Sequence, residues 1–224
     1  MIETCAAILR DGLARLGLSL DDAAVAGLCR YHAELAKWSR KMNLIAKAPL
    51  AEVIETHFLD SLTLLPVLDE LPAGGPLLDI GSGAGFPGLA LKIARPALAV
   101  TLVEPRQKRV SFLRHVIRTL GLANIEVIEE RIAPGQTTLQ GEVRSFPIVT
   151  SRAFTAIAGF LACTAGLNPP GGAVICMKGR RAEEEIAQWQ TLAPESPYTL
   201  TKTFETALPF STIPRRLLLF TKNG

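Results

Sequence analysis

The sequence has few of the side chains from which metal centres and disulfide frameworks are built. Its 224 residues include three histidines and four cysteines. The cysteines stand at positions 5, 29, 163 and 176, and no C-x-x-C pair occurs among them. Without closely spaced thiols and imidazoles, we expect neither a metal site nor a disulfide framework, and the composition favours a reducing compartment such as the cytoplasm.

Long apolar runs and a strong net charge are also missing. No run approaches the roughly 20 apolar residues of a membrane span, and Glu3, Arg10 and Asp11 interrupt the N-terminal segment in a way that excludes a signal peptide. Hydrophobic residues make up 48% and charged residues 20%, which indicates a well-filled core rather than disorder. The net charge is +3. Any contact with nucleic acid must therefore come from local clusters of Lys and Arg.

The sequence does contain a glycine-rich stretch, D-I-G-S-G-A-G-F-P-G, from Asp79 to Gly88. The apolar run that leads into it, 77–80, is too short for a helix and predicts a strand. The glycines predict a tight loop whose backbone a ligand can approach closely, because no Cβ stands in the way. Pro87 suits the first turn of a helix that continues to about Arg95, and the free N–H groups of that turn would face the ligand.

Two classes of ligand use such a loop. The last three glycines fit the G-x-G-x-x-G spacing of dinucleotide sites. The longer pattern D-x-G-x-G-x-G, from Asp79 through Gly81 and Gly83 to Gly85, places a carboxylate under the loop. That charge would repel a pyrophosphate and attract the ammonium and sulfonium groups of S-adenosylmethionine. Glu104 ends the next strand about 20 residues further on, where it could accept ribose hydroxyls of either ligand. The pattern favours S-adenosylmethionine, with a nicotinamide dinucleotide as the alternative.

The chain divides into an all-helical front piece, residues 1–75, and an alternation of strands and helices over residues 76–224. This alternation predicts an α/β fold with a doubly wound, mostly parallel sheet. The front helices are expected over 2–17, from an N-cap at Ser19 to about Met42, and over 50–68. The expected strands are 77–80, 100–104, 125–129, 148–151 and 173–177, followed by an antiparallel pair, 198–206 and 217–221. The helices between them are expected over 107–120, 155–167 and 183–192, and residues 131–146 are expected to form a long polar loop.

In an open α/β sheet, ligands bind beyond the carboxyl ends of the strands. This rule gathers Asp79, the glycine loop, Glu104, the residues after the third strand, and Ser151 with Arg152 around one crevice. The segment V-T-S-R-A-F, 149–154, contains no cysteine that could attack a pyrimidine carbon. The N-P-P at positions 168–170 comes too late in the chain to hold an exocyclic amine and is interpreted as a turn.

Histidine is not expected near this crevice, because His115 lies in a predicted helix and His32 in the front piece. Both are interpreted as structural residues. A hydroxyl or carbon acid would need a positioned general base. The acceptor that fits best is therefore one that is nucleophilic without losing a proton, such as the ring nitrogen N7 of guanine.

Several stretches resemble the bacterial small-subunit (16S) ribosomal RNA guanine-N7 methyltransferases, also called the glucose-inhibited division protein B family. The matching stretches are N-L-I-A (43–46), H-F-L-D-S-L (57–62), D-I-G-S-G-A-G-F-P-G (79–88), V-E-P-R-Q-K-R-V-S-F-L (103–113), V-T-S-R-A-F (149–154) and M-K-G (177–179). The resemblance implies a Rossmann-like class I methyltransferase fold. It also implies an S-adenosylmethionine-dependent enzyme that methylates 16S ribosomal RNA, free or in an assembling 30S particle, in the cytoplasm. A monomer is expected.

The resemblance also implies which residues hold the cofactor: Gly81, Phe86, Ile132, Ala133 and Arg152. Ile132 and Ala133 would lie beside the adenine. Arg152 would reach the methionine end or the incoming base, which makes it the catalytic candidate. The residues alone leave an alternative open, in which Arg152 is a structural ion-pair partner of Asp79 or Glu104.

Three positions depart from the family pattern. Ile45 stands where Thr is usual, and Pro147 where an Asp usually opens the fourth strand. Ala133 replaces an acid, so a side-chain bond to adenine is not expected there, although a backbone contact remains possible.

Basic residues gather in two places, and we expect both to contact RNA phosphates. The front group is Arg30, Lys37, Arg40, Lys41 and Lys47, and the group near the strand ends is Lys178, Arg180, Arg181, Arg215 and Arg216. A solvated face on a helix would give the same pattern in the front group. A small-molecule or protein methyltransferase of the same fold, and a nonenzymatic RNA-binding protein, remain alternatives.

Overall fold

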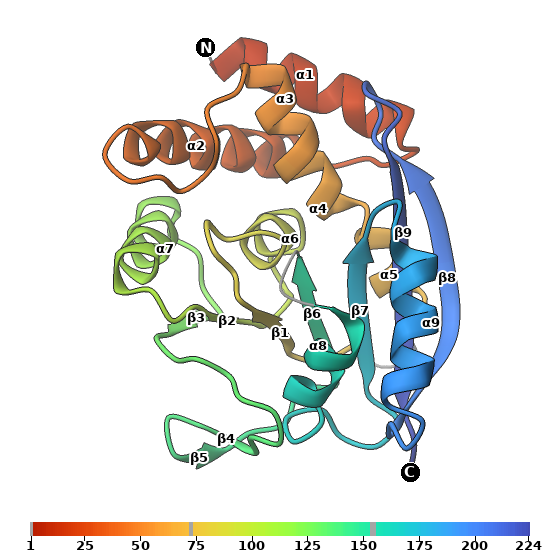
Figure 1. The fold of residues 1–224 in the computed structure, drawn as a ribbon. Helices are drawn as coiled ribbons and strands as arrows, with labels where there is room; N and C mark the ends of the chain where they lie inside the picture. The colour runs from red at the N-terminus through yellow and green to blue at the C-terminus, as the bar shows by residue number, and fades with distance from the viewer. Residues whose placement is uncertain (1, 72–73, 153–155) are drawn as a thin grey trace.

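The computed structural model describes residues 2–71, 74–152 and 156–224. A seven-stranded sheet in the order β3-β2-β1-β6-β7-β9-β8 forms its centre, with helices on both faces (Figure 1). The strands are β1 (Leu77–Ile80), β2 (Val100–Val103), β3 (Ile125–Ile128), β6 (Ile148–Arg152), β7 (Ala173–Lys178), β8 (Tyr198–Ala207) and β9 (Pro214–Lys222). Strands β3, β2, β1, β6 and β7 are parallel, and β9 is antiparallel to both β7 and β8. The predicted doubly wound, mostly parallel sheet is confirmed.

Four of the connections between the strands contain a helix. The helices are α6 (Gly88–Ala94), α7 (Gln107–Leu120), α8 (Ile157–Thr164) and α9 (Ala182–Leu192). Gly121 ends α7 in the left-handed conformation, with φ 63°. The expected polar loop at 131–146 instead contains a small hairpin, β4 (Thr138–Leu139) and β5 (Glu142–Val143). Residues 153–155, which include the end of V-T-S-R-A-F and the expected start of the helix before strand β7, lie outside the described residues.

Alternating apolar side chains on the parallel strands fill two cores, one on each face of the sheet. Leu77 and Leu102 belong to the core under α6 and α7, whereas Leu78 and Val103 belong to the core under α8. Successive residues of a strand point to opposite faces, so a strand buried on both sides must be apolar throughout. The carboxyl ends of β1, β2 and β6 therefore meet at one edge, next to the front helices (Figure 1).

The front piece consists of α1 (Ile2–Arg15), α2 (Asp22–Ser39) and one helical stretch built from α3 (Leu50–Val53), the π-helix η1 (Ile54–Leu59) and α4 (Asp60–Leu62), followed by α5 (Leu65–Asp69). The predicted N-cap at Ser19 is wrong. Asp21 caps α2 through its carboxylate, which accepts the N–H of Ala24 at 2.7 Å.

The front helices share one core with α6 and α7. Tyr31 of α2 contacts Phe58 of η1, Phe86 of the glycine loop and Phe112 of α7, with ring centroids 5.1, 5.3 and 6.4 Å apart. Cys5 and Cys29 form a disulfide between α1 and α2, with Cα atoms 5.8 Å apart. The expectation that no disulfide forms is therefore wrong, because the packing of two helices brings together cysteines that are 24 residues apart in sequence.

Glu55, buried in η1, connects the front helices to the far edge of the sheet. Its Oε1 accepts the N–H groups of Phe210 and Ser211, in the turn between β8 and β9, at 2.6 and 2.7 Å. Five residues later in the same helical stretch, Asp60 accepts a bond from Arg215 of β9 at 2.7 Å. The carboxylates of Glu55 and Asp60 thus hold the β8–β9 hairpin against the helices that face the carboxyl edge of the sheet.

We expect Glu55→Ala to lower the free energy of unfolding by about 2–3 kcal/mol, because two charge-assisted hydrogen bonds are lost together. Glu52→Ala is the matched control: Glu52 is exposed one turn earlier in the same helical stretch, and its replacement should change stability by less than about 0.5 kcal/mol. Urea unfolding of the two variants measures the difference. Equal stabilities would show that Glu55 does not hold the hairpin.

Candidate active site at the carboxyl edge of the sheet

The glycine loop turns sharply after β1 and packs tightly against its own protein. Gly81, Gly83 and Gly85 have φ of 75°, 59° and 103°, a region that residues with a Cβ rarely adopt. A Cβ at Gly85 would lie 2.6 Å from Tyr31 Oη, and one at Gly88 would lie 2.8 Å from Asp79 Oδ2. The Tyr31 hydroxyl donates a hydrogen bond to the carbonyl of Ala84. The loop is thus held in shape from below by α2 and β1.

Asp79 lies beneath this loop at the end of β1 and is fully buried. Its Oδ2 accepts the N–H of Gly88 at 2.9 Å, which ties the carboxylate to the start of α6. Burial raises the pKa of Asp79 to about 7, and the hydrogen bond from Gly88 only partly offsets this effect. A cation placed over the loop would favour the ionised carboxylate.

Glu104 follows β2 and binds the other side of the loop. One carboxylate oxygen accepts the N–H of Gly83 and the other accepts the N–H of Arg106, both at 2.9 Å. Arg109 of α7 lies 3.7 Å from the first of these oxygens. Each oxygen keeps a second lone pair, so the predicted contact with ribose hydroxyls is chemically possible.

Two buried polar atoms near the loop have no hydrogen-bond partner within the described part of the chain. They are Oδ1 of Asp79 and Oγ of Ser151. Asp79 pairs with Thr150 across the sheet, so Ser151 is only one residue beyond this pair. Buried polar atoms in native proteins normally have partners, and those that lack one indicate a ligand or water. These atoms, together with the glycines at positions 81, 83 and 85, fit a polar, cationic cofactor such as S-adenosylmethionine.

The other predicted cofactor residues lie around the same edge. Ile132 is buried, whereas Ala133 is exposed and donates its N–H to Gln136 Oε1 at 3.1 Å. Phe86 is buried and stacks between Tyr31 and His57, with centroids 5.3 and 5.2 Å away. The predicted contacts of these side chains with a cofactor stay predictions.

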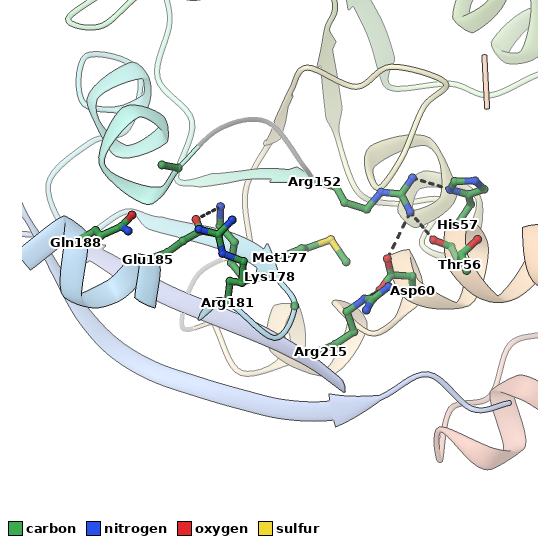
Figure 2. Close-up of a pocket in the computed structure, with 12 residues that line it drawn as sticks. Thr56, His57, Asp60, Arg152, Met177, Lys178, Arg181, Glu185, Gln188 and Arg215 are labelled. Atoms are coloured by element: carbon green, nitrogen blue, oxygen red, sulfur yellow. Dashed lines mark hydrogen bonds and ion pairs between the residues drawn. The ribbon is translucent and has the colours of Figure 1, made fainter. Parts of the chain in front are cut away.

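Arg152, at the end of β6, points toward Thr56, His57 and Asp60 of the front helices (Figure 2). One guanidinium nitrogen donates to the carbonyl of Thr56 at 2.7 Å and lies 3.4 Å from Asp60 Oδ2. The group also lies 5.1 Å from the ring centroid of Phe86. The alternative that named Asp79 or Glu104 as the ion-pair partner is therefore wrong, because Asp60 is the carboxylate that Arg152 reaches.

The expectation that no histidine lies near the crevice is also wrong. His57 stands in η1, and the second guanidinium nitrogen of Arg152 lies 2.9 Å from its Nδ1. Since arginine can only donate, Nδ1 must accept, which places the imidazole proton on Nε2. Burial, with the nearby Arg152 charge, lowers the pKa of His57 to about 4. His57 is therefore neutral at pH 7 and serves to orient Arg152.

Asp60 joins two arginines from different strands. It is buried, and it accepts bonds from Arg152 of β6 and from Nε of Arg215 of β9. These residues form one wall of a cavity of about 690 Å³ beyond β6 and β7, and Met177 and the Lys178–Glu185 ion pair form another wall (Figure 2). The cavity therefore continues from Arg152 away from the glycine loop.

The structure separates the basic residues into two kinds. Those of the front group, Arg30, Lys37, Arg40, Lys41 and Lys47, are all exposed on α2 and the segment after it. Several of the second group are already paired with acids: Lys178 with Glu185, Arg181 with Glu184, Arg215 with Asp60, and Arg216 with Glu183 and Glu205. Arg180 is exposed. In the front group, among the described residues, only Lys37 forms an ion pair, with Glu34 at 3.7 Å, so this group is better placed to contact phosphates.

Sequence reasoning missed His57 and Asp60 as site residues. Their spacing of three residues puts both on one face of a helix. That this face meets Arg152 is known only from the packing of η1 against the end of β6. It also missed Arg106, Lys108 and Arg109, which line a second cavity of about 530 Å³ with Lys41 and Asn43. Within the described residues, no helix is long and apolar enough to cross a membrane, and no group of three or more metal-ligating side chains occurs.

We expect Asp60→Asn to lower the free energy of unfolding by about 3 kcal/mol, because two partly buried arginines lose their shared carboxylate charge. The matched control is Asp69→Asn. Its pair with Arg95 is largely exposed and should contribute less than about 1 kcal/mol. Thermal unfolding of both variants measures the difference. If Asp69→Asn loses as much unfolding free energy as Asp60→Asn, the buried pair does not stabilise the site.

The sequence and the fold were compared with known proteins. A family model described as rRNA small subunit methyltransferase G matches residues 25–213. A protein named ribosomal RNA small subunit methyltransferase G from Desulfotalea psychrophila is 46% identical over 212 residues, which are 94% of this chain and 95% of that protein. One of the same name from Myxococcus xanthus is 38% identical, over 96% of this chain and 95% of its own length.

Solved structures share the fold at low sequence identity. A methyltransferase from Pyrococcus furiosus superposes with a TM-score of 0.56 at 15% identity and covers 87% of this chain and 99% of its own. TrmN from Thermus thermophilus also gives 0.56, at 18% identity, over 80% of this chain and 55% of its own. The identities of the family relatives and the match over residues 25–213 agree with the glycine loop and the sheet order: the chain belongs to the rRNA small subunit methyltransferase G family.

Proposed function

We propose that this protein transfers the methyl group of S-adenosylmethionine to N7 of a guanine in 16S ribosomal RNA. The observation that carries the proposal is the pair of carboxylates, Asp79 and Glu104, fixed to opposite ends of the glycine loop by backbone N–H groups. Membership of a methyltransferase family supports the same cofactor and the same class of RNA. The nicotinamide alternative is set aside for that reason.

The cofactor supplies an activated methyl group bound to a sulfonium. The guanine N7 lone pair would form the new bond to the methyl carbon as the carbon–sulfur bond breaks, with its electrons left on sulfur, and Asp79 and Glu104 would hold the cofactor. No proton moves in this step. The protein then has to align the two reactants and exclude water.

The groups around Arg152 suit a reaction without a general base. Histidine is the usual base at neutral pH, but the Nδ1 lone pair of His57 is used by Arg152 and its low pKa makes the imidazole a poor proton acceptor. Asp60 is held by Arg152 and Arg215. We assign to Arg152 the positioning of the cofactor's methionine end or of the incoming guanine. Its fixed, largely buried guanidinium supports this role.

The RNA approaches over the front helices in this proposal. Lys41, Arg106, Lys108 and Arg109 line the cavity of about 530 Å³ beside the Glu104 end of the loop, and no acidic residue is among its lining residues. Cations at the start of α7 are unfavourable next to the positive end of the helix dipole. Their presence there supports a role in binding an anionic partner. We further propose that the substrate is free 16S RNA or an assembling 30S particle, that the enzyme acts in the cytoplasm as a monomer, and that residues 1–75 form its helical cap.

The proposed acceptor can be tested in cells that lack this protein. We expect chemical cleavage at 7-methylguanosine in their 16S RNA to lose one site, and purified protein with S-adenosylmethionine to restore it on RNA from those cells. Mass mapping of the modified nucleosides then identifies the position. An unchanged cleavage pattern would remove the RNA assignment.

The raised pKa of Asp79 predicts a pH-dependent affinity for S-adenosylmethionine. In the free protein the carboxyl is protonated below about pH 7, and the cofactor's ammonium would favour the ionised form, so binding should release a proton. Below pH 7 the affinity should therefore rise with pH, by up to about tenfold per unit, and level off above pH 7.

Titration calorimetry in two buffers with different heats of ionisation counts the protons released. We expect close to one proton at pH 6 for the wild type and none for Asp79→Asn, which should also bind more than about tenfold more weakly at pH 8. Proton release that persists in Asp79→Asn would assign the effect to another group.

A further inference from the structure

A third cavity, of about 410 Å³, opens in the front helices on the face of α2 that carries His32, Leu35 and Ser39. It lies between α2, the connecting segment 45–48 and α3, and we call it the cap pocket. Its lining residues are His32, Leu35, Ala36, Ser39, Arg40, Ile45, Ala46, Lys47, Ala48, Leu50 and Val53. Its volume falls within the range of roughly 300–1,000 Å³ that is usual for small-ligand sites.

The inside of the cap pocket combines apolar walls with unpaired polar groups. His32 is 8% exposed and, in the described part of the chain, makes no hydrogen bond. Its closest ring neighbour is Phe58, at 6.1 Å. Ser39 Oγ is buried and also lacks a partner among the described residues. Buried polar atoms are normally satisfied, so the unsatisfied Ser39 hydroxyl, with the His32 imidazole in the same lining, indicates a ligand with polar groups.

The rim of the cap pocket is positively charged. Arg40 and Lys47 are exposed, and neither forms an ion pair with any residue that the structure describes. No acidic side chain lines the cavity. A ligand with a flat, partly apolar body and an attached anion would complement this arrangement, because the body fits the walls and the anion meets the rim.

The cap pocket is also close to the proposed methyl-transfer site along one helical stretch. Leu50 and Val53 form its wall in α3, and Thr56 and His57, which hold Arg152, follow within η1. Four residues of helix span about 6 Å along the axis. A chain whose reacting base lies at Arg152 therefore has neighbouring nucleotides within reach of the cap pocket.

We infer that the cap pocket binds an unstacked base of the RNA that is methylated, and that Arg40 and Lys47 bind the phosphate of that nucleotide. The inference rests on the proposed function, because RNA is its ligand. Proteins read RNA sequence mainly from bases that have left the helix, through stacking and through hydrogen bonds to the base edges. His32 and Ser39 supply those bonds, so the cap pocket selects the sequence beside the target guanine.

Filling the cap pocket tests this assignment. Ala36→Leu adds apolar volume to a half-buried wall position of α2, and Ala26→Leu is the matched control because Ala26 is exposed on the same helix. We expect Ala36→Leu to raise the KM for 16S RNA about tenfold while kcat, the affinity for S-adenosylmethionine and the melting temperature stay unchanged. Ala26→Leu should match the wild type in all four measurements.

A second readout does not depend on methylation. Saturation-transfer NMR with AMP, CMP, GMP and UMP should show base protons in contact with the wild type and with Ala26→Leu, and no contact with Ala36→Leu. Ser39→Ala, which changes no volume beyond the hydroxyl, should alter the preference among the four nucleotides. If mononucleotide binding survives in Ala36→Leu, the inference is overturned, whatever the methylation assay shows. A different result would separate the two proposals. If the wild type methylates no RNA but binds mononucleotides, and Ala36→Leu does not bind them, the proposed function fails and the cap pocket remains a nucleotide site.

Discussion

The Asp60 carboxylate, buried between Arg152 and Arg215, is the interaction on which the rest of the site depends. It joins the helices before the sheet to β6 on one side and to β9 on the other. A buried carboxylate between two guanidinium groups is favourable only when the geometry is held from several directions. Here η1 supplies that support, because Thr56 and His57 bind Arg152 while Glu55 binds the β8–β9 turn.

The protonation states of the residues near Arg152 agree with methyl transfer to an acceptor atom that has no proton to lose. His57 is neutral because burial and Arg152 lower its pKa to about 4, and Asp79 is close to half-ionised at pH 7 because burial raises its pKa to about 7. Arg152, which stays charged, lies beside His57. The site is thus arranged to receive a cation over the glycine loop. Among the described residues, the histidine that contacts Arg152 is His57, and its Nδ1 is occupied by that arginine and cannot take up a proton from the acceptor.

The sequence predicts the sheet well, because its evidence is local. Each parallel strand is an apolar run followed by a turn, and Gly121 ends α7 where a glycine was expected to end it. The interactions of Arg152 were not predictable in this way. Its partners are 92 to 96 residues away, and only the packed front helices bring them to the end of β6. The Cys5–Cys29 disulfide was not predicted for the same reason, because its cysteines are 24 residues apart and meet only when α1 packs on α2. The cap at Asp21 rather than Ser19 is a smaller error, since both residue types cap helices well.

The front helices contribute to the site as well as covering the core. A domain that only bound the cofactor would need the glycine loop and Glu104, both of which the sheet and its own loops supply. The helices add Tyr31, which bonds the loop, and the η1 residues, which fix Arg152. They also carry both outer cavities: residues 41–44 line the cationic one, and residues 39, 40 and 45–48 line the cap pocket. Since one short segment contributes to both, a shift in that segment on RNA binding would change phosphate contacts and base contacts together.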